Sequence, residues 1–330
     1  MRLVLLLCVA FMSPCFSVWI PLEFVNDTGT YYLYVGIGTP SQYFNLEPNL
    51  STWAVQVPSK SCANCSHAFD STNSSTFVPL VVAESGIRGL DFMKAFNVPP
   101  LNQTFWQVAF GSGNPIIDGF IGFGYGVTAN TTQYPPWFIT VARYFNVMDV
   151  FTLNYDYKTL SNAKLTIGEI DTAAFSGSIQ YIPAISKPNS SYWIFPFSSI
   201  VVGDDQIALA CSKTSTCYST IMSTSEYIYG PRTDIGLIVS QLNVTQNCST
   251  YAQLPLVYIS IGNETYSIPP EVYVRRVNGS CYPKFAPLVI DNLVTWAFGT
   301  SFLQSVYTIY NLQENIIGFA KSVNAHQAPV

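Results

Sequence analysis

The sequence predicts an all-β protein that folds as two lobes. Short apolar runs rich in β-branched and aromatic residues, such as 32–37, 52–57 and 308–312, are separated by Gly, Pro, Asn and Ser. Apolar runs separated by such turn residues are typical of a fold with many short strands. Helical periodicity is found at 137–145 and 234–242. A chain of 330 residues can supply two lobes of about 150 residues, each with its own core.

The first 17 residues have the features of a secretory signal peptide. Arg2 supplies a positive end, residues 3–12 form an apolar core, and Cys15 and Ser17 are the small residues expected around a cleavage site. The apolar core is too short to span a membrane, and no later stretch reaches about 18 apolar residues without interruption. We therefore expect a secreted, extracellular protein with no membrane span.

Composition argues against several classes of function. Charged residues make up 10% of the chain, the net charge is −5, the pI is near 5.0, and Lys and Arg do not cluster. Nucleic acid and anionic membranes are therefore not expected as partners. The two histidines, His67 and His326, lie far apart, and the sequence has neither a GxGxxG motif nor a P-loop. No metal site and no cofactor are predicted.

One stretch resembles the start of a catalytic site that lacks its acid. Residues 31–40 read YYLYVGIGTP, and residues 44–59 read FNLEPNLSTWAVQVPS. These segments resemble the first strands of pepsin-like aspartic peptidases, family A1, which read YYGxIxIGTPPQxFxVxFDTGSSxLWVPS. Aligned without gaps, the family's catalytic Asp falls on Asn49, and its Thr and Gly fall on Leu50 and Ser51. The resemblance implies a lost carboxylate, because an amide cannot ionise.

The resemblance covers nearly the whole chain after the leader, and it implies the pepsin fold of two barrel-like β lobes around a central cleft. The family's second catalytic loop is matched by 218–231, YSTIMSTSEYIYGP. Counting back from its Gly-Pro places Met222 at the second catalytic Asp, so both acids are predicted to be absent. Further matches follow in family order at 62–77, 85–91, 118–125, 165–172, 191–195, 268–281 and 298–303.

Two other acids are candidates to replace the missing pair. Asp234 follows the Gly-Pro instead of preceding it, and we interpret Thr233 or Asp234 as a capping residue suited to the first turn of a helix, which favours negative charge. Glu47 shares a strand face with Asn49 but lies two residues, roughly 7 Å, away, and Pro48 makes the local backbone harder to predict. We expect neither acid to meet a partner across the cleft.

A weak internal repeat supports two related lobes, at 18–175 and 176–330. Asn49 lies 73 positions before Gly122, and Met222 lies 77 positions before Gly299. In the family, a hydrophobic-hydrophobic-Gly tripeptide crosses beneath each catalytic loop and supports it. The resemblance gives this role to Phe120, Ile121, Gly122, Ala297, Phe298 and Gly299.

Cysteine usage suggests disulfides. Eight cysteines become six once Cys8 and Cys15 leave with the leader, and six in an oxidising compartment suggest three bridges. Sequence alone leaves the pairing open. The resemblance implies Cys62–Cys65, Cys211–Cys217 and Cys248–Cys281. The alternative is a redox-active C-x-x-C at 62–65, which we disfavour because no βαβ pattern surrounds it.

Asn-x-Ser/Thr sequons are frequent enough to predict a glycan-coated surface. We expect Asn64 and Asn247 to remain unmodified, because each is followed by a cysteine expected in a disulfide, and Asn49 because it would lie in the cleft floor. The sequons predicted to carry glycans are Asn26, Asn73, Asn102, Asn130, Asn189, Asn243, Asn263 and Asn278.

The sequence therefore predicts a secreted, glycosylated member of family A1 that keeps the fold, has lost the catalysis, and binds a peptide or protein in the cleft as a monomer. Two alternatives remain open: an active acid endopeptidase with an unconventional dyad, and a structural or storage glycoprotein. A carboxyl pair at the cleft floor would favour the former. The absence of any specific bound partner would favour the latter.

Overall fold

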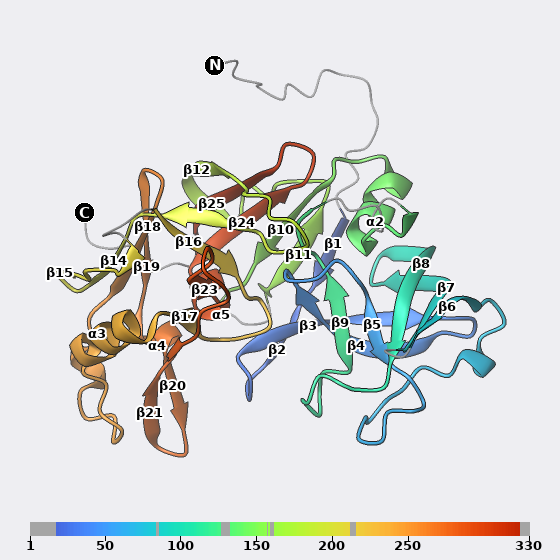
Figure 1. The fold of residues 1–330 in the computed structure, drawn as a ribbon, viewed down its shortest axis with the longest axis horizontal. Helices are drawn as coiled ribbons and strands as arrows, with labels where there is room; N and C mark the ends of the chain where they lie inside the picture. The colour runs from blue at the N-terminus through green and yellow to red at the C-terminus, as the bar shows by residue number, and fades with distance from the viewer. Residues whose placement is uncertain are drawn as a thin grey trace.

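A computed structural model describes residues 18–83, 86–126, 133–156, 158, 162–211 and 216–323. Strands dominate these residues and the helices among them are short, which confirms the all-β prediction. Figure 1 shows the N-terminal strands, in blue and cyan, on one side of the molecule and the C-terminal strands, in yellow and orange, on the other, with a further sheet between them. The fold is bilobal, as predicted.

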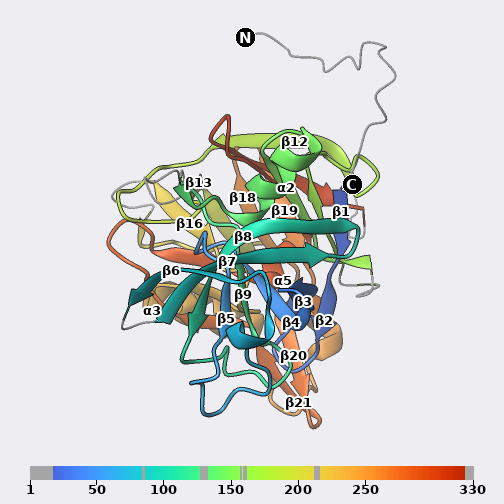
Figure 2. The same cartoon turned by 90° about the vertical axis from the view of Figure 1, so that its right-hand side faces the viewer.

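An eight-stranded, barrel-like sheet forms the N-terminal lobe and faces the viewer in Figure 2. Its strands, in spatial order, are β2 (Glu23–Val25), β3 (Thr30–Ile37), β4 (Gln42–Asn49), β9 (Gly119–Gly122), β5 (Gln56–Pro58), β8 (Val98–Val108), β7 (Gly86–Ala95) and β6 (Val78–Ala83). An additional pairing of β3 with β7 bends the sheet back on itself. Side chains alternate along a strand, and the inward set of β3 and β4, including Leu33, Val35 and Leu46, is fully buried.

Three smaller sheets form the C-terminal lobe. The five-stranded sheet has the order β13 (Phe195–Phe197), β16 (Cys217–Ile221), β23 (Trp296–Phe298), β17 (Ile228–Gly230) and β22 (Phe285–Pro287). The four-stranded sheet has the order β15 (Asp205–Gln206), β14 (Ser199–Val202), β18 (Val257–Ile261) and β19 (Glu264–Ile268). The third is a hairpin of β20 (Val274–Val277) and β21 (Ser280–Pro283). The parallel pairing of β16 with β23 repeats that of β4 with β9.

A six-stranded sheet joins the two lobes. Its order is β1 (Val18–Pro21), β11 (Lys164–Ile167), β10 (Val150–Asn154), β24 (Val306–Asn311), β25 (Ile316–Ser322) and β12 (Phe175–Pro183). The lobe boundary that we predict between 175 and 176 falls at the start of β12. The buried Trp193 also bridges the lobes, because its Nε1 donates to the Phe123 carbonyl at 2.7 Å and its ring packs against Phe151 and Tyr310.

The helices of the described residues are α2 (Trp137–Phe145), α3 (Arg232–Leu242), α4 (Pro270–Tyr273) and α5 (Thr300–Leu303). The first matches the predicted range, and α3 begins two residues before its predicted start.

The capping prediction for α3 is wrong. Its N-cap is Pro231, which makes no side-chain cap. Asp234 does lie in the first turn, as predicted, but its carboxylate accepts from the Ala210 amide at 3.0 Å instead of capping the helix. None of the helices in the described segments has the length and apolar character needed to cross a membrane.

Two local details near Asn49 differ from the sequence prediction. Only residues 56 and 57 of the predicted run 52–57 belong to a strand, β5. The start of the run is a turn, in which the Thr52 carbonyl accepts from the Gly124 amide at 2.7 Å. Pro48 lies inside β4 without disrupting it. The pairing of β4 with β3 ends at Leu46, so the nitrogen of Pro48 has no ladder partner to lose.

The three cysteine pairs implied by the family resemblance are bonded in the structure. Cys62–Cys65, Cys211–Cys217 and Cys248–Cys281 have Cα separations of 5.6, 5.1 and 5.2 Å, which is the usual range for a disulfide. Cys62 and Cys65 are thus in the oxidised form, which a structural pair and a redox-active C-x-x-C pair share.

The sequon asparagines lie mostly at the surface. Asn49 is half-buried, whereas Asn64 and Asn247 are exposed. Asn130 and the predicted signal peptide lie outside the described residues. The remaining sequons predicted to carry glycans are all exposed: Asn26, Asn73, Asn102, Asn189, Asn243, Asn263 and Asn278.

Candidate functional site

The first of two related loops follows β4, which ends at Asn49. β9 runs parallel beside β4 with Asn49 opposite Gly122, and the amide after Gly122 donates to the Asn49 carbonyl at 2.8 Å. A Cβ at Gly122 would lie 2.3 Å from the backbone carbon of Trp53, so only glycine fits there. Phe120 and Ile121 precede it in the same strand, and β9 therefore lies directly against the loop.

The second loop follows β16 and repeats this arrangement. Met222 comes directly after β16, and its amide donates to the Phe298 carbonyl of the parallel strand β23 at 3.0 Å. Ala297 and Phe298 are buried. A Cβ at Gly299 would lie 2.3 Å from the Ser225 carbonyl oxygen. Both loops thus rest on a hydrophobic-hydrophobic-Gly strand end.

The two loops meet through one buried hydroxyl. Ser223 Oγ donates to the Pro48 carbonyl at 2.6 Å and accepts from the Leu50 amide at 3.1 Å. Ser223 and Leu50 occupy equivalent places, one residue after Met222 and Asn49. Because Leu50 has no hydroxyl, it cannot return the same pair of bonds. The loops are joined from one side, at the interface between the lobes.

Comparison with protein families decides the identity of this fold. Residues 30–322 match the model of the eukaryotic aspartyl proteases. This chain belongs to that family. It is also similar to chymosin from Callithrix jacchus, with 25% identity over 89% of this chain and 81% of the relative, and to chymosin from Camelus dromedarius, with 26% identity over the same shares. Pepsin A from Bos taurus is 25% identical over 91% of this chain and 86% of its own.

The two side chains that the sequence predicts at the acid positions of this family, Asn49 and Met222, carry no ionisable group. Asn49 turns its Oδ1 back into its own loop, where it accepts from the Ser51 amide at 2.8 Å. Met222 is half-buried and carries a thioether, a weak acceptor without a proton to give. The pair provides no titratable group.

Glu47 is the acid nearest to this loop in sequence, and it belongs to the protein interior. The side chain is 6% exposed on β4, opposite Phe120. Burial raises its pKa from 4.5 to about 7, partly offset by a hydrogen bond from Thr30. Burial raises the pKa of Tyr155, and the negative charge of Glu47 adds to that increase. The sequence predicts no partner for Glu47 across the cleft, and Glu47 accepts a hydrogen bond from Thr30 on its own lobe.

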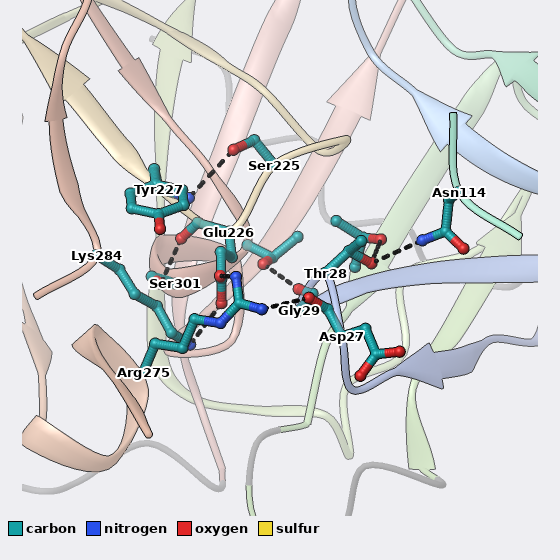
Figure 3. Close-up of polar contacts among 12 residues, drawn as sticks. Asp27, Thr28, Gly29, Asn114, Ser225, Glu226, Tyr227, Arg275, Lys284 and Ser301 are labelled. Atoms are coloured by element: carbon teal, nitrogen blue, oxygen red, sulfur yellow. Dashed lines mark hydrogen bonds and ion pairs between the residues drawn. The ribbon is translucent and has the colours of Figure 1, made fainter. Parts of the chain in front are cut away.

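A charged cluster beside the second loop was not apparent from the sequence. Glu226 is buried four residues after Met222, with Arg275 Nη1 at 2.9 Å and Lys284 Nζ at 3.2 Å (Figure 3). The only sequence signal is a single acid in the otherwise uncharged run STSEYIYG. Arg275 and Lys284 lie 49 and 58 residues further along the chain, so spacing alone could not identify them.

Proposed function

We propose that this chain is a secreted, glycosylated and catalytically inactive pepsin-like protein that binds a peptide or protein in the cleft between its lobes. The observation that carries this proposal is the pair of side chains on the two joined loops, an amide at Asn49 and a thioether at Met222. Membership of the family supports the cleft. The three disulfides and the exposed sequons support an extracellular location.

The missing carboxyl groups account for the proposed loss of activity. Aspartic peptidases use two carboxyl groups that share one proton, so that one acts as base and the other as acid. The base takes a proton from the attacking water, and the acid protonates the oxyanion that develops on the substrate carbonyl. Asn49 carries a neutral amide, which cannot take the proton of the attacking water. Each acid or base contribution is worth about 10²–10⁴-fold, so the loss of both is expected to leave no useful turnover.

An acid digestion assay tests the catalytic part of the proposal. The purified mature protein should not cleave denatured haemoglobin or casein between about pH 2 and 6, whereas a pepsin in parallel does. The double variant Asn49→Asp/Met222→Asp should recover little activity, because Leu50 and Ser51 still replace the Thr and Gly that flank the family's first acid. Acid proteolysis by the unmodified protein that a statine inhibitor blocks would overturn the proposal.

A peptide-selection experiment tests the binding part. Peptides selected from a random displayed library on the immobilised protein should lose binding to Met222→Arg, which places a charged side chain at the cleft floor. The matched control is Leu237→Arg on α3, where the side chain is 47% exposed, and it should bind as the unmodified protein does. Peptides that bind both variants equally, or no selected peptide at all, would contradict binding in the cleft and favour a structural or storage glycoprotein.

The alternative of an active peptidase with an unconventional dyad has little geometric support. It would require Glu47 or Asp234 at the cleft floor. Glu47 is held by Thr30, and the carboxylate of Asp234 is held by the Ala210 amide in front of α3. If the digestion assay nevertheless detects activity, either Glu47→Gln or Asp234→Asn should abolish it.

A further inference from the structure

The turn between β2 and β3 belongs to the N-terminal lobe, yet C-terminal side chains hold it. Arg275 Nη2 donates to the Asp27 carbonyl at 2.6 Å, and Thr300 Oγ1 donates to the Gly29 carbonyl at 2.5 Å. Figure 3 shows Asp27, Thr28 and Gly29 beside Glu226 and Arg275. Residues more than 240 positions apart in the sequence therefore meet at this turn.

Electrostatics makes Glu226 the centre of these contacts. Its side chain is 5% exposed and pairs with both Arg275 and Lys284. A carboxylate removed from water needs such partners, because an unpaired buried charge is strongly unfavourable. Burial lowers the pKa of Lys284, and the attraction of Glu226 opposes that effect. The attraction of Glu226 therefore favours the charged form of Lys284, whereas burial and the neighbouring Arg275 disfavour it.

The turn also fits the triad sterically. Gly29 has φ +66°, and a Cβ there would lie 2.5 Å from Glu226 Oε2. Only glycine combines this left-handed backbone with so close an approach to the carboxylate. Ser301 Oγ donates to the Glu226 carbonyl at 2.5 Å and fixes the backbone of the same residue. The carboxylate is thereby held against the turn.

We propose that Glu226, Arg275 and Lys284 form an electrostatic latch that fixes the 26–29 turn to the C-terminal lobe. Glu226 follows the second loop, and the turn leads into β3, which pairs with β4, the strand that ends at Asn49. The latch acts beside the Ser223 contact and sets how the lobes sit across the cleft. The negative charge of Glu226, more than the volume of its side chain, holds the turn in place.

Hydrogen exchange tests the role of charge. Glu226→Gln keeps the size of the side chain and removes its charge, leaving two cations unneutralised. The Gly29 amide, which bonds to the Val25 carbonyl at 2.8 Å, should then exchange about a hundredfold faster. The control is Glu264→Gln, which breaks the exposed pair with Lys321 and should leave Gly29 unchanged. Unchanged exchange at Gly29 in Glu226→Gln would overturn the latch.

A second variant separates the effect of charge from that of packing. Glu226→Gln/Lys284→Met removes one unneutralised cation together with the acid. It should slow the exchange of Gly29 by about tenfold relative to Glu226→Gln, because one buried cation no longer lacks a partner. Faster exchange in the double variant than in Glu226→Gln would show that Lys284 matters only for packing, and would contradict the proposal.

The turn itself provides an independent test. Gly29→Ala should push the Glu226 carboxylate away, whereas Gly177→Ala has a similar φ of +75° and nothing within 4 Å of the new Cβ. Both variants carry similar backbone strain, so the difference between them reports the contact of the turn with Glu226. We expect a lower melting temperature for Gly29→Ala than for Gly177→Ala, and little further loss when Glu226→Gln is added. Equal melting temperatures of the two glycine variants would overturn the latch.

Discussion

Replacing Glu47 with Gln should stabilise the protein at neutral pH and not in acid. The folded state raises the pKa of Glu47 from 4.5 to about 7 because the side chain is buried. Below about pH 4.5 the group is protonated in both states and makes no difference. As the pH rises to about 7, the unfolded chain gains from ionisation and the folded protein does not, so stability falls. Above about pH 7 the full penalty is present.

The size of this penalty follows from the change in pKa. Raising the pKa from 4.5 to about 7 corresponds to about 3 kcal/mol at 25 °C. A glutamine cannot ionise, so Glu47→Gln removes the penalty. It also buries an amide nitrogen that needs a partner, which costs about 1–3 kcal/mol at every pH. The change in the relative free energy of unfolding between two pH values cancels this constant cost and leaves only the contribution of ionisation.

The assay is urea unfolding of the unmodified protein and Glu47→Gln at pH 4, 6 and 8. The free energy of unfolding of the variant, relative to the unmodified protein, should rise by about 3 kcal/mol from pH 4 to pH 8. Glu264→Gln, at an exposed ion pair, should show a much smaller change over this range. A relative free energy for Glu47→Gln that does not vary with pH would refute the reasoning, because it would mean that Glu47 ionises as easily in the folded protein as in the unfolded chain.

Three further predictions concern the joined loops, the disulfides and the glycans. Ser223→Ala should lower the free energy of unfolding by about 1–3 kcal/mol, because the Pro48 carbonyl and the Leu50 amide both lose a buried partner; an unchanged urea midpoint would contradict this. Removing Cys248–Cys281, which closes a separation of 33 residues, should lower the melting temperature more than removing Cys62–Cys65, which closes 3; the reverse order would contradict the loop-entropy argument. Peptide N-glycosidase should lower the mass of the secreted protein, and no mass change would contradict the glycan prediction.

The sequence by itself determined the local features of this protein. Alternating apolar runs and turn residues gave the all-β class, and an amphipathic stretch gave α2 (Trp137–Phe145). The residues at the two loops, Asn49 and Met222, could be located because the motifs around them are contiguous. The residues around Asp234 predict the helix that contains it. They do not predict the hydrogen bond of the Asp234 carboxylate, because the Ala210 amide that donates it lies in another loop.

Only the tertiary structure decided what lies between the lobes. The Ser223 hydroxyl binds the backbone of a loop 173 residues away, and Arg275 reaches a turn 248 residues away. No local pattern specifies such partners, because they depend on how complete sheets pack. The raised pKa of Glu47 has the same origin: Glu47 is the single acid of its strand, and only the packing of other elements over it removes the water that would let it ionise.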